Sequence, residues 1–243
     1  MLIDLAKAEK QGLFSTQVII AALNEEEGIG LTVAELMDTL GGSRVLVVDG
    51  KSTDRTVEVA KNLGAEIFVQ DGIGKGDAIA EAIAHIDSTV DYVVLTDADY
   101  TYPAAYIPKM IQILENTPDA GMVCGNRFNG YEEKTASSSI FYVGNRFIAF
   151  AHNLLNGVSL ADPLTGLRVV RAGILRKWKV QSKGFDVEVE LNHHVEREGY
   201  GIVEVPISYR ERLGQKKLGV KNGAEIFKRI MIEFVNENRK RMA

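Results

Sequence analysis

Two aspartates separated by one alanine, Asp97-Ala98-Asp99, follow directly on a largely apolar stretch that begins at Val90. A buried strand of an open α/β sheet presents the residues at its carboxyl end to the ligand crevice. Two carboxylates at this spacing repel each other unless a positive charge lies between them. A divalent cation, which binds carboxylate oxygens, usually supplies that charge. The spacing therefore predicts that Asp97 and Asp99 hold a metal ion at the end of a strand.

Polar residues also follow the three apolar stretches that precede this one. The four expected strands cover residues 17–23, 44–49, 65–69 and 90–97. Helical patterns separate them, and this alternation is the signature of a parallel sheet with right-handed crossovers. Asn24 and Glu25 follow the first strand, the second ends at Asp49, and a glycine-rich loop with Lys75 follows the third. We therefore expect an α/β fold with a Rossmann-like, mostly parallel sheet flanked by helices, and one edge that gathers these polar residues.

The rest of the chain continues this pattern. Expected helices cover residues 103–116, 141–157, 187–198 and 224–240; expected strands cover residues 121–125 and 202–208, a turn at residues 162–171 enters a further strand, and residues 131–139 form a mobile loop. The 141–157 helix is apolar nearly all round, so we interpret it as buried. In the last helix, Ile226, Phe227, Ile230, Met231 and Phe234 should face inward. Since no linker or repeat is visible, we expect one domain over residues 1–243, with a core at about 16–220 and a basic helix at about 223–241.

Composition limits the class of protein. The chain has 243 residues, 46% hydrophobic and 25% charged, which suits a globular protein with a substantial core. The single cysteine, Cys124, has no partner for an internal disulfide, which fits a reducing cytoplasmic compartment. The N-terminal residues do not resemble a signal peptide, and no uncharged apolar stretch has the length of about 18 residues that a spanning helix needs.

The charge is unevenly distributed along the chain. The net charge is −5, yet residues 209–243 hold ten Lys and Arg against four Asp and Glu. Such a basic segment is either a solvated helix face or a surface that meets an anionic partner, for which phosphate, nucleic acid and lipid headgroups are candidates.

Short motifs of two other protein classes were compared with the sequence, and neither fits it fully. The loop at Lys75 lacks the Ser or Thr that follows the lysine of a Walker loop, because Gly76 stands there. Asp97, Asp99 and Thr101 do match the D-x-D-x-T that opens haloacid-dehalogenase phosphatases, in which Asp97 would be the nucleophile. That motif normally ends the first strand of its domain, whereas three strand–helix units precede it here, and Asp162 lacks the carboxylate neighbour of the later acidic pair. The phosphatase interpretation therefore ranks second.

Seven motifs, in order and at matching spacing over residues 16–220, resemble the inverting family 2 glycosyltransferases, and most closely their dolichol-phosphate mannose synthase-like branch. They are the first-strand ending at residues 21–26, VVDGKSTDRT at 47–56, the G-K-G loop at 74–76, the D-x-D at 97–99, G-N-R at 125–127, DPLTGLR at 162–168 and the closing pattern at 204–218. The family's Pro and Tyr are Ala21 and Leu23 here, which affects stacking on the nucleotide base. Gly50 replaces an Asp, and Lys216 replaces a Ser.

The resemblance implies a GT-A fold and a site for a nucleotide-diphospho-sugar donor, with UDP or GDP as the nucleotide. Donor contacts would come from Ala21, Leu23, Glu25, Asp49, Lys75, Asp97, Ala98 and Asp99. Asp97 and Asp99 would bind Mg²⁺ or Mn²⁺, which offsets the charge that develops on the leaving nucleotide. The catalytic candidates are Asp99 and Asp162, of which Asp162 would deprotonate a hydroxyl acceptor.

A lipid phosphate is already anionic and needs cations rather than a base. The cations at matching family positions are Arg127, Arg212 and Lys217, and Arg146, Arg210 and Lys216 are expected to assist them. The favoured function is transfer of one sugar to a polyprenyl or dolichyl phosphate. The protein would be either cytoplasmic or bound peripherally to the cytoplasmic face of the membrane, with the basic tail and the 141–157 helix as the candidate contacts. A glycosyltransferase with a soluble acceptor and a non-catalytic nucleotide-sugar-binding module are competing interpretations. No nucleic-acid partner is expected, and the sequence leaves homo-oligomer formation, sugar and nucleotide open.

Overall fold

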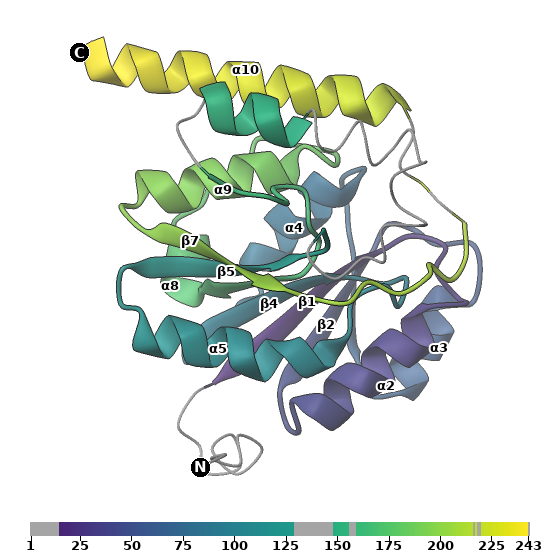
Figure 1. Cartoon of the computed structure of the whole chain (residues 1–243). Coiled ribbons are helices and arrows are strands. Elements are labelled where there is room, and N and C mark those ends of the chain that lie inside the picture. Colours follow the sequence, from purple (N-terminus) through teal and green to yellow (C-terminus); the bar gives the residue numbers. More distant parts are fainter. Residues whose placement is uncertain (1–14, 129–147, 156–158, 216, 218–219, 243) are drawn as a thin grey trace.

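The computed structural model describes residues 15–128, 148–155, 159–215, 217 and 220–242. A seven-stranded sheet with the order β3-β2-β1-β4-β6-β5-β7 forms its centre (Figure 1). The strands are β1 (Thr16–Ala22), β2 (Arg44–Asp49), β3 (Glu66–Val69), β4 (Tyr92–Asp97), β5 (Ala120–Asn126), β6 (Arg168–Arg171) and β7 (Gly201–Pro206). β6 runs antiparallel to both of its neighbours, β4 and β5, whereas the other paired strands are parallel. The expected fold class, a mostly parallel sheet flanked by helices, is confirmed.

Helices cover both faces of the sheet because its strands are apolar on both sides. Along β1, Val18 and Ile20 belong to one hydrophobic core and Ile19 to the other, as the two-residue period of a strand requires. The first core includes α2 (Ile29–Thr39), α3 (Thr56–Asn62) and α5 (Ile107–Asn116), which a 3₁₀ turn (Ala104–Tyr106) precedes. The second core includes α4 (Lys75–Ile83), α8 (Ala172–Leu175) and α9 (Val187–Arg197).

A third layer lies outside α9 (Figure 1). It consists of the helix at residues 148–155 and α10 (Val220–Met242), which pack together around Val189, Ile226 and Ile230. α10 begins four residues earlier than expected. Two helices of this kind have only one side to pack on, so the other side of each stays open to solvent.

This one-sided packing corrects two expectations. Ile226 and Ile230 are buried as predicted, but Phe227 and Met231 are 40% and 38% exposed, so the prediction that they face inward was wrong. Leu154, on the described part of the expected 141–157 helix, is 68% exposed, so this helix is not buried on all sides. The remainder of that helix and the expected loop at 131–139 lie outside the described residues. Among the helices that are described, none combines the length and the apolar character needed to cross a membrane.

Candidate active site

The site lies at the carboxyl ends of β1, β2 and β4, where the sequence placed it. Ala21 of β1 is in register with Asp97 of β4, and the neighbouring Ala22 is in register with Asp49 of β2. The residues that leave these strands therefore meet at one edge of the sheet.

Backbone strain also collects at these strand ends. Asn24, Lys51 and Tyr100 have φ angles of 48°, 67° and 64°, in the left-handed region that residues other than glycine rarely adopt. Each lies two or three residues beyond the end of β1, β2 or β4. Such conformations cluster at functional sites, because the surrounding structure must stabilise them.

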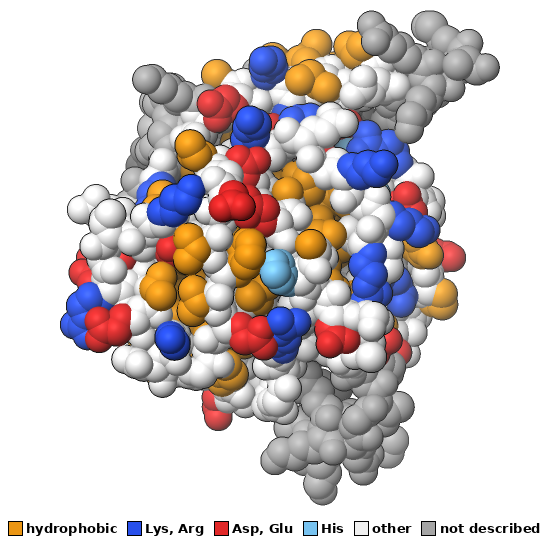
Figure 2. All heavy atoms as spheres, turned by 180° about the vertical axis from the view of Figure 1, so that it is seen from behind, with side chains coloured by type: hydrophobic (Ala, Val, Ile, Leu, Met, Phe, Trp, Pro, Cys, Tyr) orange, Lys and Arg blue, Asp and Glu red, His pale blue; other side chains and the backbone are white. Residues whose placement is uncertain are grey.

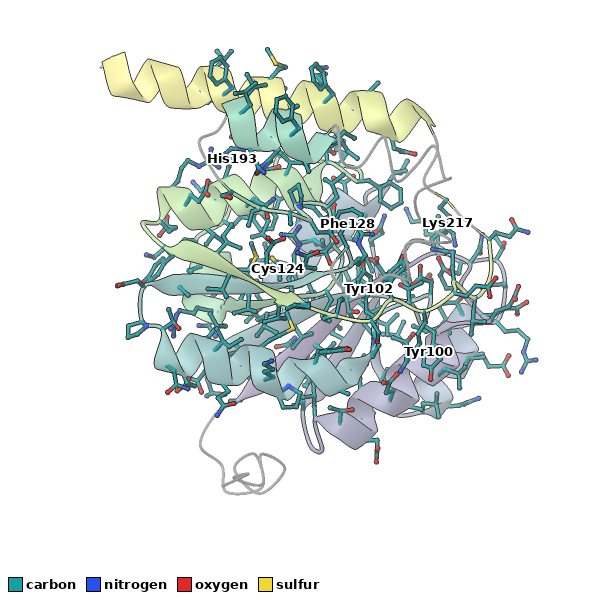
Figure 3. All side chains as sticks on the ribbon, viewed as in Figure 1. Tyr100, Tyr102, Cys124, Phe128, His193 and Lys217 are labelled. Atoms are coloured by element: carbon teal, nitrogen blue, oxygen red, sulfur yellow. The ribbon has the colours of Figure 1, made fainter. Side chains whose placement is uncertain are left out.

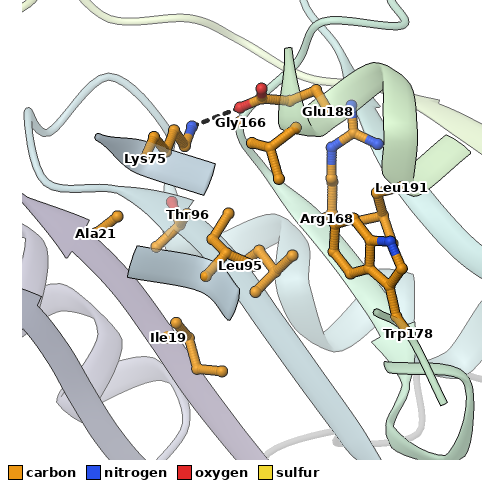
Figure 4. Close-up of a pocket in the computed structure, with 12 residues that line it drawn as sticks. Ile19, Ala21, Lys75, Leu95, Thr96, Gly166, Arg168, Trp178, Glu188 and Leu191 are labelled. Carbon is orange, nitrogen blue, oxygen red and sulfur yellow. Dashed lines mark ion pairs between the residues drawn. The ribbon is translucent and has the colours of Figure 1, made fainter. Parts of the chain in front are cut away.

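Asp97 is held by a lysine that is itself shared between two carboxylates. Lys75 Nζ lies 2.6 Å from Asp97 Oδ1. It also lies 2.6 Å from Glu188 Oε1 of α9, the ion pair that Figure 4 shows. Burial is the largest influence on Asp97 and acts to raise its pKa, but the charge and hydrogen bond of Lys75, together with the charges of Arg127 and Arg212, outweigh it and lower the pKa. Burial likewise acts to lower the pKa of Lys75, and the two carboxylates outweigh it and raise the pKa. The lysine is therefore charged, and so is Asp97.

Gly166 makes room for the Asp97 carboxylate. A Cβ atom added at Gly166 would lie 2.3 Å from Asp97 Oδ2, far inside contact distance. The amide of Gly166 donates a hydrogen bond of 2.7 Å to the Tyr102 hydroxyl, which fixes this close approach. The close approach of Asp97 thus explains why the DPLTGLR motif has a glycine at position 166.

Asp99 has both carboxylate oxygens engaged. Its Oδ1 accepts hydrogen bonds from the Thr101 hydroxyl (2.6 Å) and the Thr101 amide (3.2 Å), and its Oδ2 accepts from the Arg212 guanidinium. Burial and the negative charge of Asp97 raise the pKa of Asp99 in spite of Arg212. The environments of the two aspartates thus move their pKa values in opposite directions.

Arg212 joins Asp99 to a second buried carboxylate, that of Glu25. Its other terminal nitrogen donates to Glu25 Oε1, and the Lys217 ammonium lies 2.5 Å from the same oxygen. Burial nevertheless raises the pKa of Glu25. Two backbone hydrogen bonds hold this basic segment over the aspartates, from Arg210 N to Thr101 O (3.0 Å) and from Leu213 N to Asp99 O (3.2 Å). In Figure 3, Lys217 is labelled above Tyr102 and Tyr100 below it.

Asp162 is paired with Arg127 through both of its oxygens. Arg127 Nε lies 2.6 Å from Oδ2 and Nη2 lies 2.7 Å from Oδ1, and the Asp162 side chain is 1% exposed. Glu204 positions the turn, since it accepts hydrogen bonds of 2.7 Å from the amides of Ala161 and Asp162. A carboxylate that is held in this bidentate way is poorly placed to accept a proton from a substrate.

Several predicted residues occupy other environments. Arg210 donates two hydrogen bonds, of 2.6 and 2.9 Å, to Glu35 of α2 and lies over the Tyr100 ring, so it does not join Arg212 at the aspartates. Asp49 accepts backbone hydrogen bonds of 3.0 Å from Lys51 and Ser52 and stabilises the turn after β2. Ala98 is buried, and Leu23 is 40% exposed at the rim. Arg146 and Lys216 lie outside the described residues.

The sequence missed two buried residues that support the site. Glu188 carried no signal beyond an acidic residue in the first turn of a helix. Arg168 is 1% exposed and holds the Asp162 turn, because it donates to the carbonyls of Pro163 (2.7 Å) and Thr165 (2.9 Å) and to Asn192 (2.5 Å). It was visible only as the last residue of the DPLTGLR motif.

Asp97 and Asp99 are the carboxylates that could hold a divalent cation. The described residues contain no cluster of three or more His, Cys, Asp or Glu side chains that would form a complete protein cage. Two carboxylates nevertheless suit Mg²⁺ or Mn²⁺, which commonly bind through one or two protein carboxylates and complete their coordination with substrate phosphates and water. The residues present thus fit a cation that arrives with a phosphate ligand.

Comparison with known proteins adds to this geometry. Residues 17–178 match the family model for glycosyl transferase family 2. A dolichyl-phosphate hexose transferase of Haloferax volcanii is 33% identical over 228 residues, which cover 93% of this chain and 96% of that protein. An undecaprenyl-phosphate mannosyltransferase of Micrococcus luteus is 31% identical over 216 residues, which cover 82% of this chain and 86% of that protein.

Solved structures share the fold. Glucosyl-3-phosphoglycerate synthase from Mycobacterium tuberculosis, in complex with Mn²⁺, UDP and glucosyl-3-phosphoglycerate, superposes with a TM-score of 0.73 over 97% of this chain and 84% of that one. The sequence identity is 19%, so this likeness bears on the fold alone.

Proposed function

This chain belongs to glycosyl transferase family 2, as its motifs predicted, and we propose that it moves one sugar from a UDP- or GDP-sugar to a polyprenyl or dolichyl phosphate. Glycosyltransferase activity follows from the family and the relatives, whereas the donor and the acceptor are our proposal. One observation supports a phosphate as the acceptor: cations, rather than a free base, face Asp97 and Asp99. Arg212 and Lys217 lie against the donor-side carboxylates, and Asp162 is occupied by Arg127.

The acceptor chemistry explains why this arrangement favours a phosphate. A hydroxyl acceptor must lose a proton in the transition state, so its enzyme needs a carboxylate that is free to take that proton. A lipid phosphate is already anionic and needs only to be oriented and kept from repelling the donor diphosphate. The Arg212 guanidinium group could bind phosphate oxygens with two parallel hydrogen bonds once it leaves Asp99 and Glu25, and Lys217 would add a point charge. Arg127 donates its Nε and Nη2 to Asp162, so it is not counted among these groups.

The residues proposed to bind the donor would stabilise its leaving group. Asp97 and Asp99 would hold Mg²⁺ or Mn²⁺, which when bound offsets the charge on the departing nucleoside diphosphate. Lys75 stays close to this charge and supplements it. The acceptor phosphate oxygen forms a bond to the anomeric carbon as the bond to the diphosphate breaks on the opposite face, so the configuration at that carbon is inverted.

Exposed apolar side chains support contact with a membrane surface. Phe227, Met231 and Val235 of α10 lie at intervals of four residues and are 40%, 38% and 43% exposed; Phe150 and Leu154 are 62% and 68% exposed. Figure 2 shows hydrophobic side chains along the top of the molecule, where α10 lies; the face below carries further hydrophobic side chains and charges of both signs. A helix with an apolar row of this kind can lie in the interface of a bilayer, which would bring the site to a lipid acceptor.

The test is transfer of labelled sugar from a panel of UDP- and GDP-sugars to a polyprenyl phosphate in the presence of Mg²⁺ or Mn²⁺. We expect label in the organic phase, and we expect Asp97→Asn and Asp99→Asn to abolish its appearance while Asp38→Asn, on the exposed side of α2, retains it. Label transferred only to a water-soluble acceptor would refute the lipid acceptor. Release of inorganic phosphate from a phosphomonoester, together with a phosphorylated Asp97, would instead support the phosphatase interpretation.

A further inference from the structure

Glu188 is a buried carboxylate that the proposed reaction does not use directly. It stands in the first turn of α9 and reaches Lys75, 113 positions earlier in the chain, at a distance of 2.6 Å. Its side chain is 9% exposed. Its second oxygen, Oε2, is buried and has no hydrogen-bond partner among the described residues. Burying a carboxylate oxygen without a hydrogen-bond partner costs stability, and the pairing of Glu188 with Lys75 has to offset that cost.

The backbone around this contact is built for close approach. The amide of Gly76, in the first turn of α4, donates a hydrogen bond of 2.9 Å to the carbonyl of Lys183, just before α9. A Cβ atom at Gly76 would lie 2.1 Å from the carbonyl oxygen of Ser182. The amino-terminal ends of α4 and α9 are therefore held together by main-chain contacts, which place Glu188 against Lys75 independently of the ion pair.

The charges in this group explain what Glu188 contributes. Lys75 neutralises Asp97, and a divalent cation at Asp97 competes with the ammonium group for the same carboxylate. Without Glu188, a cation bound to Asp97 would leave the Lys75 ammonium group buried without a counter-ion. The ammonium group would also lie beside the positive charge of that cation. With Glu188 present, the group of three side chains carries one net negative charge, and Lys75 keeps a counter-ion when Asp97 binds the metal.

We propose that Glu188 is a positioning residue of the donor site, which retains the Lys75 ammonium group so that Asp97 can bind a divalent cation. This inference rests on the metal-binding role of Asp97 and Asp99 in the proposed function. It assigns no contact between Glu188 and the substrate, because Glu188 Oε2 is shielded from solvent.

The test measures Mn²⁺ binding to the full chain by electron paramagnetic resonance of free Mn²⁺, alone and with UDP or GDP. Glu188→Gln keeps the shape and a hydrogen-bond acceptor for Lys75 but removes the charge. We expect it to raise the Kd for Mn²⁺ about tenfold, the lower end of the effect seen when groups that support metal ligands are replaced. Glu188→Asp, which keeps the charge, should restore most of the affinity.

Glu233→Gln is the matched control. The Glu233 side chain is likewise buried, at 3% exposed, and is paired with an arginine, Arg197 at 2.8 Å, but it lies on α10 and does not contact Lys75. We expect Glu233→Gln to lower stability towards urea and to leave the Kd for Mn²⁺ within about twofold of the wild type. If Glu188→Gln behaves in the same way, with lower stability and an unchanged Kd, Glu188 is merely structural and the inference is overturned.

A second comparison separates an effect through Lys75 from a direct one. In a Lys75→Met background, Glu188→Gln should change the Kd for Mn²⁺ by less than about twofold, because the group that it retains is absent. This double variant buries neither charge, so it remains measurable if Glu188→Gln alone does not fold. A further tenfold loss in this background would contradict the proposal. A wild-type chain that binds no Mn²⁺ with or without nucleotide would overturn both this inference and the metal requirement, whereas an effect of Asp97→Asn without one of Glu188→Gln would overturn this inference alone.

Discussion

Replacement of Arg212 by glutamine should destabilise the fold and at the same time strengthen Mn²⁺ binding. Arg212 donates to Asp99 Oδ2 and to Glu25 Oε1, and Asp99 Oδ1 already accepts from Thr101. A cation that binds Asp99 must therefore displace the guanidinium group or the Thr101 hydroxyl. In the variant this competitor is absent, but two buried carboxylates have lost a counter-ion.

The magnitudes follow from the environment of Arg212. Hydrogen bonds to charged groups contribute about 1.5–3 kcal/mol each, and Arg212 makes two such contacts. Its side chain is 25% exposed and Glu25 retains Lys217, so the loss in unfolding free energy should be about 2–3 kcal/mol rather than the full sum. If the bond to Asp99 opposes the cation by about 1.4 kcal/mol, its removal should lower the Kd for Mn²⁺ about tenfold.

Both quantities can be measured on the same samples. Urea unfolding in the presence of EDTA reports the stability of the metal-free protein, and titration calorimetry reports the Kd for Mn²⁺. Arg210→Gln is the matched control, because Arg210 belongs to the same segment and pairs with Glu35 instead of Asp99. It should lose no more than about 1 kcal/mol of stability and keep the wild-type Kd. An Arg212→Gln variant that binds Mn²⁺ more weakly than the wild type would show that Arg212 assists the cation, and would refute this reasoning.

Two further predictions concern packing and pH. Gly166→Ala should weaken Mn²⁺ binding at least about tenfold, because the added methyl group would displace the Asp97 carboxylate. Gly173→Ala is the control, since its Cβ would contact nothing within 4 Å, and it should have no effect. Equal Kd values for the two variants in calorimetry would contradict the steric role of Gly166. Burial lowers the pKa of His152 to about 4 and that of His193 to about 3, so both stay neutral in the folded state while the unfolded chain takes up protons below about 6.5. The free energy of unfolding should therefore decrease as the pH falls from about 6.5 towards 4, by up to about 3 kcal/mol for His152 alone, and urea unfolding of His152→Gln should show a shallower decrease; parallel curves would exclude this histidine as the cause.

The strands at the centre of the sheet could be predicted because each one is apolar on both faces. β1, β2 and β4 begin and end within two residues of the expected positions. The position of β6 could not be predicted, because its antiparallel pairing of Arg168 with Leu95 and Cys124 joins segments far apart in the sequence. Local patterns specify that a segment is a strand, but they do not specify its partner.

The outer layer was misjudged for a related reason. The apolar residues of α10 suggest a wide buried face, yet only one side of the helix meets α9 and the helix at residues 148–155. Ile226 and Ile230 lie on that side, and Phe227 and Met231 lie outside it. An apolar residue on a helix predicts contact with something apolar, and a single chain does not show whether that is its own core or a membrane.

The acidic half of the site was visible from position alone, but its partners were not. Glu25, Asp97 and Asp99 follow strands, so the sheet brings them together whatever the rest of the chain does. The family resemblance favoured Arg212 over Arg210, but their partners could not be predicted, because the path of the segment after β7 directs Arg210 to Glu35 and Arg212 to Asp99. Glu188 carries no local signal, because its role depends on a helix packed against Lys75.

These pairings couple the two halves of the reaction. The carboxylates proposed to serve the donor and the cations proposed to serve the acceptor are each other's counter-ions: Asp99 and Glu25 on one side, Arg212 and Lys217 on the other. A cation that reaches Asp99 with the donor diphosphate must break these contacts, and the freed guanidinium and ammonium groups then need a new anion. A phosphate is the anion that the proposed reaction supplies. Stronger Mn²⁺ binding in Arg212→Gln would therefore also predict that donor and acceptor favour each other's binding, because the metal at Asp99 frees these cations for the phosphate and the phosphate draws them away from Asp99.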